Sequence, residues 1–263
     1  MVDKIFKMYN NNGYYGGFRM EFIANGAQAD LYKNNGMAIK LFKKNISKEE
    51  IEYEMNLQKK AFEYGLPVPK IHDIVEIDGK YGILMEYIDG VPIGEFVFKD
   101  QGILQEYLIK SIEIQIQLNN IATDKFPSMK DKLKRQITNT QELDVADKEK
   151  LLSKIDKIVF ENKLCHGDFH FFNLIETSND IKIIDWVDSS AGNAEADVCR
   201  TYLLYKMNHE ILAESFIDSY CKITKVPKEN ILNWLPFLAA ARLSEGRDKK
   251  ENEILRNIAK ANL

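Results

Sequence analysis

The chain has 263 residues, of which 36 are Lys or Arg and 40 are Asp or Glu, so its formal net charge is -4. A protein that coats nucleic acid needs a basic surface, and this balance argues against that class. Apolar residues make up 45% of the chain, which is enough to bury a core and excludes disorder by composition.

Strands with one helix among them are predicted in the first ninety residues. Residues 18–24, 37–43 and 81–87 alternate or cluster apolar side chains, as strands do. The turn signals Asn34-Asn35-Gly36 and Asp78-Gly79 precede the second and third of these segments.

The helix in this part of the chain has clear predicted ends. Ser47 and Glu50 form a capping box at its start, and Gly65 predicts its end, with Pro67 just beyond. Its apolar face holds Ile51, Met55, Leu57, Ala61 and Phe62. Glu54 falls in the middle of this face, where a carboxylate needs a partner because an unpaired buried charge is costly.

After Asp89-Gly90-Val91-Pro92 the chain changes character and amphipathic helices predominate. The expected helices cover residues 103–122, 145–161, 194–208, 210–222, 228–244 and 248–261. A β-rich island from Leu164 to Trp186 interrupts them, with a turn at Ser178-Asn179-Asp180. We therefore expect an α+β chain with a small β-rich lobe (residues 1–87) and a larger helical lobe (residues 88–263), joined by a hinge near residues 86–91.

The cysteines and the apolar segments indicate the compartment. Three cysteines, an odd number without C-x-x-C spacing, favour free thiols in a reducing cytoplasm. The segment Met1 to Lys7 lacks the apolar stretch of a secretion signal. The longest apolar stretch, Ile231 to Leu243, is too short to span a bilayer and is interrupted by Asn233 and Pro236. A cytoplasmic protein without membrane contact is expected.

The segment from Cys165 to Asn173, with the sequence C-H-G-D-F-H-F-F-N, carries the clearest chemical signal. Asp168 and Asn173 are five residues apart, and Asp185 ends the next apolar strand, so a hairpin would bring the three side chains together. Mg²⁺ prefers oxygen ligands, and a further carboxylate can accept the proton of an attacking hydroxyl. The pattern favours phosphoryl transfer from a nucleotide. The alternative is that these residues only cap a hairpin turn.

Two features of the first lobe fit the same chemistry. Lys40 lies in mid-strand, where a lysine is seldom buried without a partner, and Glu54 is the natural partner. Such a lysine can contact nucleotide phosphates, although a solvent-facing edge lysine is the alternative. The small-residue turn from Ala24 to Asp30 can lie over phosphates through its backbone N–H groups. It holds only one glycine, so a plain hairpin turn fits as well.

Together these segments resemble the aminoglycoside phosphotransferase and choline kinase family, which are small-molecule kinases. The matching segments are Ala38-Ile39-Lys40, Glu54 ahead of Gly65-Leu66-Pro67-Val68-Pro69, His166-Gly167-Asp168 through Asn173, Ile184-Asp185-Trp186, and Ala194 through Thr201. The resemblance runs from about residue 18 to at least residue 243. It implies a bilobal protein-kinase-like fold.

The resemblance also implies residue roles. Asp168 would be the catalytic base or hydroxyl-orienting group, and Asn173 and Asp185 would hold Mg²⁺. Lys40 would contact the α and β phosphates of ATP or GTP, with Glu54 as its ion-pair partner. The nucleotide would also meet the phosphate-loop residues Gly26 and Ala27 and the linker backbone at Glu86, Tyr87 and Ile88. His166 and Asp197 would support the catalytic loop without reacting.

Two departures from the family pattern stand out. Asn119 follows Leu118 where the family often has a histidine, and the glycine-poor nucleotide loop leaves the choice of nucleotide open. A protein kinase would carry H-R-D and D-F-G motifs and a long activation segment. Here the helix predicted from Ala194 begins within ten residues of Asp185. A small acceptor is therefore expected instead of a peptide.

The acceptor is expected to be cationic or neutral, because acids gather in one stretch. Between Leu164 and Cys199, seven acidic side chains face one basic side chain, Lys182. Candidate acceptor-binding acids are Asp188, Glu195 and Glu245. Trp234 offers a ring for a choline-like cation, although core packing is the better expectation for it.

The sequence leaves three functions open. An aminoglycoside-type antibiotic is the first-choice acceptor, with antibiotic resistance as the role. The alternatives are a kinase of a metabolite such as choline, a sugar or an amino alcohol, and a pseudokinase that only binds nucleotide. The oligomeric state is left open.

Overall fold

The computed structural model describes residues 9–10, 14–15 and 18–261. The segment Met1 to Lys7, considered above as a possible secretion signal, lies outside these residues. Within the described part of the chain, no helix is both long and apolar enough to cross a membrane.

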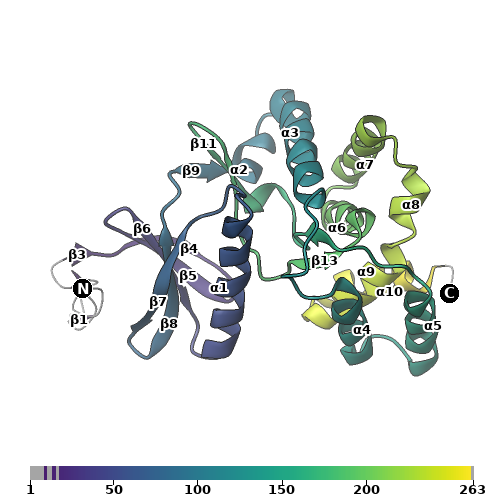
Figure 1. The fold of residues 1–263 in the computed structure, drawn as a ribbon, viewed down its shortest axis with the longest axis horizontal. Coiled ribbons are helices and arrows are strands. Elements are labelled where there is room, and N and C mark those ends of the chain that lie inside the picture. Colours follow the sequence, from purple (N-terminus) through teal and green to yellow (C-terminus); the bar gives the residue numbers. More distant parts are fainter. Residues whose placement is uncertain (1–8, 11–13, 16–17, 262–263) are drawn as a thin grey trace. The chain divides into compact units, whose positions relative to one another are not determined.

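The described residues divide into two compact units (Figure 1). The β unit takes its residues from Met1–Pro92 and Leu174–Val187, and the helical unit from Ile93–Asn173 and Asp188–Leu263. The expected α+β class, with a β-rich part followed by a mainly helical part, is confirmed. The hairpin within Leu174–Val187 groups with the β unit although it follows the helical unit's first segment in the chain. The lobe boundary at residue 87 stays a prediction.

A five-stranded antiparallel sheet forms the centre of the β unit, in the order β4-β5-β6-β8-β7. Its strands are β4 (Glu21–Asn25), β5 (Ala29–Asn34), β6 (Met37–Phe42), β7 (Ile71–Ile77) and β8 (Lys80–Glu86). Three two-residue strands, β1 (Tyr9–Asn10), β2 (Tyr14–Tyr15) and β3 (Phe18–Arg19), form a separate small sheet. The segments of β5 and β7 were not predicted as strands.

Both predicted turns of this sheet are confirmed. Asn35 and Gly36 join β5 to β6 with φ values of 50° and 75°, and Asp78 and Gly79 join β7 to β8 with φ values of 50° and 69°. Two consecutive residues with positive φ are the backbone of a tight hairpin turn, which Asn-Gly and Asp-Gly adopt readily.

Helix α1 (Lys48–Glu63) carries the predicted capping box. The Ser47 hydroxyl accepts the Glu50 N–H at 3.2 Å, and the Glu50 carboxylate accepts the Ser47 N–H at 2.8 Å. The helix is followed by Gly65, whose φ is 76°. The prediction that Phe62 lies on the apolar face was wrong, since this side chain is 44% exposed. Helix α1 contacts β7 and β8, and its Ile51 and Met55 pack in the core cluster on that face of the sheet.

Strand β6 alternates between the two faces of its sheet. Ile39 and Leu41 pack into the core on one face, and Phe42 packs with Ile51 of α1 on the other. Lys40 lies two residues before Phe42 in the strand, so both side chains start on the same face of the sheet, the one that α1 covers.

A second three-stranded sheet of the β unit has the order β12-β11-β9. Its strands are β9 (Gly90–Pro92), β11 (Leu174–Thr177) and β12 (Ile181–Ile183). The predicted turn at Ser178-Asn179-Asp180 is confirmed, because the Thr177 N–H donates to the Asp180 carbonyl at 2.9 Å. The segment that was expected to be a plain break after residue 89 forms strand β9.

Helix α6 (Ala194–Lys206) lies at the centre of the helical unit, with nine buried residues (Figure 1). The other helices are α2 (Ile93–Val97), α3 (Gln101–Asn119), α4 (Met129–Asn139), α5 (Val145–Asp156), α7 (Glu210–Thr224), α8 (Lys228–Leu232), α9 (Leu235–Arg242) and α10 (Lys249–Lys260). Short 3-10 helices cover Phe171–Asn173 and Leu243–Glu245, and β10 (Lys163–Cys165) pairs with β13 (Ser190–Gly192).

Two helical predictions need correction. The single helix expected over residues 228–244 is two helices, α8 and α9, because Pro236 suits only the first turn of a helix. Helix α4 was missed because its sequence is strongly polar. Its buried side chains, Met129, Leu133 and Ile137, recur at every fourth position, and the Ser128 cap was a second available signal.

Candidate active site

The loop after β10 depends on a glycine in a left-handed conformation. Gly167 has a φ of 80°, and a Cβ atom there would lie 2.4 Å from the Asp188 carbonyl oxygen. A side chain at this position would have to displace backbone, so the central glycine of His166-Gly167-Asp168 is a steric requirement.

Asp197 holds this loop from the first turn of α6. Its side chain is buried, with the residue 1% exposed, and its Oδ1 accepts the Gly167 N–H at 2.8 Å. Its Oδ2 accepts hydrogen bonds from Gln115 at 3.1 Å and Asn119 at 3.0 Å, both on α3. Asn119 also donates to the Leu164 carbonyl at 2.9 Å. The asparagine that departs from the family pattern thus ties α3 to both β10 and Asp197.

Asp168 lies at the exposed side of the same loop. Its Oδ2 accepts a hydrogen bond from the Asn173 amide at 3.1 Å and lies 3.4 Å from Nε2 of His170. Burial raises the pKa of the carboxyl, but His170, Arg200 and His166 together outweigh burial and hold the pKa well below its usual range. Asp168 is therefore ionised at neutral pH and can accept a hydrogen bond from a hydroxyl. His166 is fully buried, and its Nδ1 accepts the Asp168 N–H at 3.2 Å.

Asn173 and Asp185 offer oxygen atoms of the kind that Mg²⁺ prefers. The Asn173 amide nitrogen donates to the backbone and side chain of Asp168, so its Oδ1 is the atom left for a cation. Asp185 keeps 38% of its side chain exposed. Asp185 belongs to the β unit, two residues after β12, whereas Asn173 is the last residue of the helical unit's first segment. Among the described residues, no group of three or more His, Cys, Asp or Glu could hold a metal ion by itself.

Lys40 of strand β6 forms ion pairs with Glu54 of helix α1 and with Asp185, which follows the β11–β12 hairpin, all within the β unit. Its Nζ lies 2.6 Å from Oε1 of Glu54 and 3.3 Å from Oδ1 of Asp185. Burial lowers the pKa of Lys40, but the Asp185 and Glu54 carboxylates outweigh it and raise the pKa above its usual value. The ammonium is thus a fixed positive charge beside Asp185.

The other nucleotide residues predicted from the resemblance also lie in the β unit. Gly26 and Ala27 form the exposed turn between β4 and β5, where the Gly26 N–H donates to the Ala29 carbonyl at 2.8 Å. Glu86 ends β8, and its N–H donates to the Lys70 carbonyl at 2.8 Å. Tyr87 and Ile88 follow as a half-buried connection to β9.

The sequence profile of the phosphotransferase enzyme family matches residues 20–235. The chain belongs to the phosphotransferase enzyme family. Its members transfer a phosphoryl group to a hydroxyl group of a small molecule, and the chain is accordingly a small-molecule kinase. No curated protein shows detectable sequence similarity to it.

Solved structures show the same fold at low sequence identity. A mutant of aminoglycoside phosphotransferase APH(4)-Ia in complex with ADP and hygromycin B has a TM-score of 0.73 and 11% identity, covering 94% of each chain. The choline kinase LicA from Streptococcus pneumoniae has a TM-score of 0.62 and 17% identity, covering 92% of this chain and 94% of its own. The amicoumacin kinase hAmiN, with AMP-PNP and Ca²⁺, has a TM-score of 0.60 and 13% identity, covering 98% of this chain and 90% of its own. The predicted protein-kinase-like fold is confirmed.

In this phosphotransferase, a cavity of about 520 Å³ opens beside Asp168 in the helical unit. Its lining includes the aromatic side chains of Phe98 and Phe172 and the cationic side chains of Arg242 and Arg247. Sequence reasoning did not find these four residues. Phe172 belongs to the C-H-G-D-F-H-F-F-N segment itself, so its position was an available signal. Arg242, at the end of α9, and Arg247, just before α10, come from distant segments and had none.

The predicted acceptor-binding acids lie outside the lining of this cavity. Asp188 pairs with Lys132 at 2.6 Å, and Glu195 lies in the first turn of α6. Glu245 pairs with Arg200 at 2.7 Å and also contacts the two cavity arginines. Contact of these acids with an acceptor stays a prediction, and two of them are already neutralised by cations of the chain.

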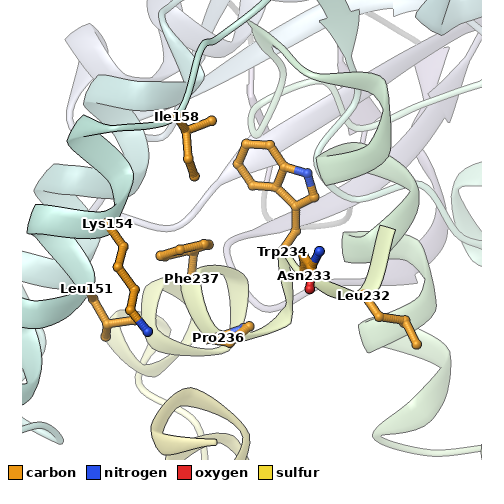
Figure 2. Close-up of a pocket in the computed structure, with 8 residues that line it drawn as sticks. All are labelled: Leu151, Lys154, Ile158, Leu232, Asn233, Trp234, Pro236 and Phe237. Carbon is orange, nitrogen blue, oxygen red and sulfur yellow. The ribbon is translucent and has the colours of Figure 1, made fainter. Parts of the chain in front are cut away.

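Trp234 lines a separate pocket of about 460 Å³, together with Leu151, Lys154 and Phe237 (Figure 2). The indole makes edge-to-face contacts with Phe160 and Phe237, with ring centroids 5.6 and 6.2 Å apart. The residue is 8% exposed, and Asp168 does not line this pocket. Trp234 is therefore a packing residue, as expected, and is not part of the Asp168 cavity.

Proposed function

We propose that the chain transfers the γ-phosphoryl group of ATP or GTP to a hydroxyl group of a small molecule, with Mg²⁺ as the cofactor. The observation that carries this proposal is the Asp168 carboxylate, which is ionised, accepts a hydrogen bond from Asn173, and belongs to the lining of a cavity large enough for a small molecule.

In the proposed reaction, Asp168 accepts a hydrogen bond from the acceptor hydroxyl and orients its oxygen toward the γ-phosphorus. The oxygen–phosphorus bond forms, the bond from the γ-phosphorus to the bridging oxygen of the nucleotide breaks, and the nucleoside diphosphate leaves. The hydroxyl proton passes to Asp168 and then to solvent. Because the pKa of Asp168 is low, the carboxylate is a weak base and takes the proton late, when the hydroxyl has become acidic.

The other predicted residues support binding and orientation. Asn173 and Asp185 would hold Mg²⁺, which when bound neutralises charge on the phosphates. Lys40 would contact the α and β phosphates and is oriented by Glu54. Gly26, Ala27 and the backbone of Glu86, Tyr87 and Ile88 would surround the nucleotide. His166 and Asp197 would keep the Asp168 loop in place.

Two acceptor classes have support. An aminoglycoside-type antibiotic, with resistance as the role, is supported by the acid-rich sequence and by the likeness to the hygromycin-bound structure. A metabolite is supported by the likeness to a choline kinase and, more specifically, by the two arginines that line the Asp168 cavity. A polycation would meet those arginines unfavourably, so we place the metabolite first. A cytoplasmic location fits the three free cysteines.

The test is nucleoside diphosphate release by the full chain with Mg²⁺ and ATP or GTP. The acceptor panel contains hygromycin B, choline, ethanolamine and simple sugars, and products are identified by mass spectrometry. We expect acceptor-stimulated turnover and a product that carries one added phosphoryl group, both lost in Asp168→Asn. Nucleotide hydrolysis that no acceptor stimulates, even after the panel is extended to hydroxy acids, would contradict the proposal.

A further inference from the structure

The cavity beside Asp168 carries a charge pattern that the proposed function does not explain. Arg242 is the last residue of α9 and is 5% exposed, and Arg247 lies just before α10 with 39% of its side chain exposed. Both line the cavity together with Asp168. A buried arginine normally has its charge balanced by carboxylates, so the local balance decides what this cavity binds.

Three guanidinium groups share two carboxylates at this position. Arg242 donates from Nε and Nη2 to Glu251 at 3.0 and 2.8 Å, and from Nη1 to Glu245 at 3.2 Å. Arg247 donates from Nη2 to Glu245 at 2.7 Å. The third guanidinium belongs to the buried Arg200, which donates to Glu245 at 2.7 Å. Two further carboxylates act on Arg200: Asp188, which is held by Lys132, and Asp168, which lines the cavity.

Both cavity arginines keep donors for a further partner. A guanidinium has five N–H groups, and the hydrogen bonds above use three from Arg242 and one from Arg247. Burial lowers the pKa of Arg242, and the charge of Arg200 lowers it further, so that Glu245 and Glu251 do not restore it to its usual value. Glu245 and Glu251 thus do not fully offset the cost of burying the Arg242 guanidinium, although both contact it.

Aromatic rings form another part of the cavity lining. Phe98 stacks on His209 with centroids 4.6 Å apart and on Phe172 with centroids 6.0 Å apart. Phe98 is 36% exposed and Phe172 is 51% exposed. Exposed aromatic faces inside a concave site suit an apolar or planar part of a ligand.

We propose that the acceptor hydroxyl belongs to a molecule with a carboxylate group, which binds Arg242 and Arg247, and with an apolar or planar part, which lies on Phe98 and Phe172. The inference rests on the proposed function, because it names the acceptor of the same site. A carboxylate matches the forked geometry of a guanidinium. A phosphate dianion fits less well than a carboxylate monoanion, because its larger negative charge would be repelled more strongly by the Asp168 carboxylate in the same cavity.

The experiment uses matched sets of acceptors that differ only in charge. One set is 4-(hydroxymethyl)benzoate, 4-(hydroxymethyl)benzamide and 4-(hydroxymethyl)benzylamine; a second is 4-hydroxybutanoate, 4-hydroxybutanamide and 4-aminobutan-1-ol. Binding to the full chain without nucleotide is measured by calorimetry, and turnover with ATP and GTP by product formation. We expect the carboxylate of at least one set to exceed its amide by about tenfold or more in affinity and in kcat/KM, the range of a charge-assisted hydrogen bond.

Variants of Arg247 test whether the cavity arginines cause the preference for the carboxylate over the amide. Arg247→Gln should reduce the carboxylate-to-amide ratio about tenfold while leaving the affinity for the amide nearly unchanged, and Arg247→Lys should restore part of the ratio. The matched control is Arg256→Gln on α10, whose side chain is 37% exposed, pairs with Glu142 and lies outside the cavity lining. This control should keep the wild-type ratio.

The outcomes separate the inference from the proposed function. A carboxylate preference in binding without turnover of any hydroxyl compound would support a carboxylate site at the arginines, but it would overturn the proposed function and with it the acceptor role of the bound molecule. Turnover with equal or better use of the amines would support the proposed function and overturn the inference. Absence of carboxylate binding in both sets, or a ratio that Arg247→Gln leaves intact, would likewise overturn the inference.

Discussion

Lys40 on strand β6 and Glu54 on helix α1 form an ion pair whose Nζ and Oε1 atoms are 2.6 Å apart. Only 6% of the Glu54 side chain is exposed, against 25% for Lys40. The pair therefore fixes the orientation of the lysine relative to the sheet and leaves part of its side chain accessible.

Removing Lys40 should destabilise the β unit. We expect Lys40→Met to lower the free energy of unfolding by about 3 kcal/mol, because it leaves the Glu54 carboxylate buried without its partner. The measurement is urea denaturation followed by circular dichroism. Lys48→Met, which removes an exposed pair with Glu52, is the control and should cost less than about 1 kcal/mol. Equal losses of unfolding free energy in the two variants would show that the Lys40–Glu54 pair stabilises the β unit no more than an exposed ion pair does.

Loss of the Asp168 carboxylate should affect turnover and spare nucleotide binding. For Asp168→Asn we expect kcat to fall by about 10²–10⁴, the usual contribution of a general base. Nucleotide affinity, measured by calorimetry, should stay within about twofold of the parent. Asp185→Asn is the contrasting variant and should weaken the binding of nucleotide with Mg²⁺. Near-normal turnover of Asp168→Asn would remove this residue from the mechanism.

Gly167, in the loop after β10, should tolerate no side chain. Gly167→Ala places a Cβ atom 2.4 Å from the Asp188 carbonyl, so we expect a loss of more than about 2 kcal/mol in unfolding free energy together with reduced kcat. Gly79→Ala is matched in backbone conformation, with a φ of 69° and no atom near the added Cβ. It should cost only about 1 kcal/mol and leave kcat unchanged. Similar stability losses in both variants would contradict the steric argument.

The three cysteines should differ in reactivity. Burial raises the pKa of the Cys165 and Cys199 thiols well above the usual value, and it also raises that of the partly exposed Cys221. A raised thiol pKa means less thiolate at a given pH, so reaction should speed up as the pH rises from 7 to 9. With a disulfide reagent, we expect Cys221 to react first and the other two only on unfolding. Mass spectrometry of native protein identifies the modified residue, and Cys221→Ser should abolish the fast phase.

Several features of the fold and site follow from local patterns. The Asn-Gly and Asp-Gly turns and the Ser47 capping box involve residues adjacent in sequence, so their conformation depends little on the rest of the chain. The contact between Lys40 and Glu54 was predictable for another reason. Each charge occupies an apolar position of its own element, and two misplaced opposite charges stabilise each other.

Other features depended on contacts between distant segments. Helix α4 has a polar sequence and packs against segments distant in the chain, among them α9 and β13, so periodicity alone did not reveal it. The role of Asn119 arises because α3 passes both Leu164 and Asp197. Neither contact leaves a signal near Asn119 in the sequence.

By itself, the sequence determined the fold class and the identity of the chemical groups, because capping boxes, tight turns and the H-G-D-x-x-x-x-N spacing are short-range patterns. The tertiary structure alone decided which charges share the Asp168 cavity. Counting acids along the chain predicted a cationic or neutral acceptor, but folding pairs Asp188 and Glu245 with lysine and arginine and leaves Arg242 and Arg247 in the cavity lining. The charge that a ligand meets depends on which side chains neutralise one another in space, and a count along the sequence does not contain that information.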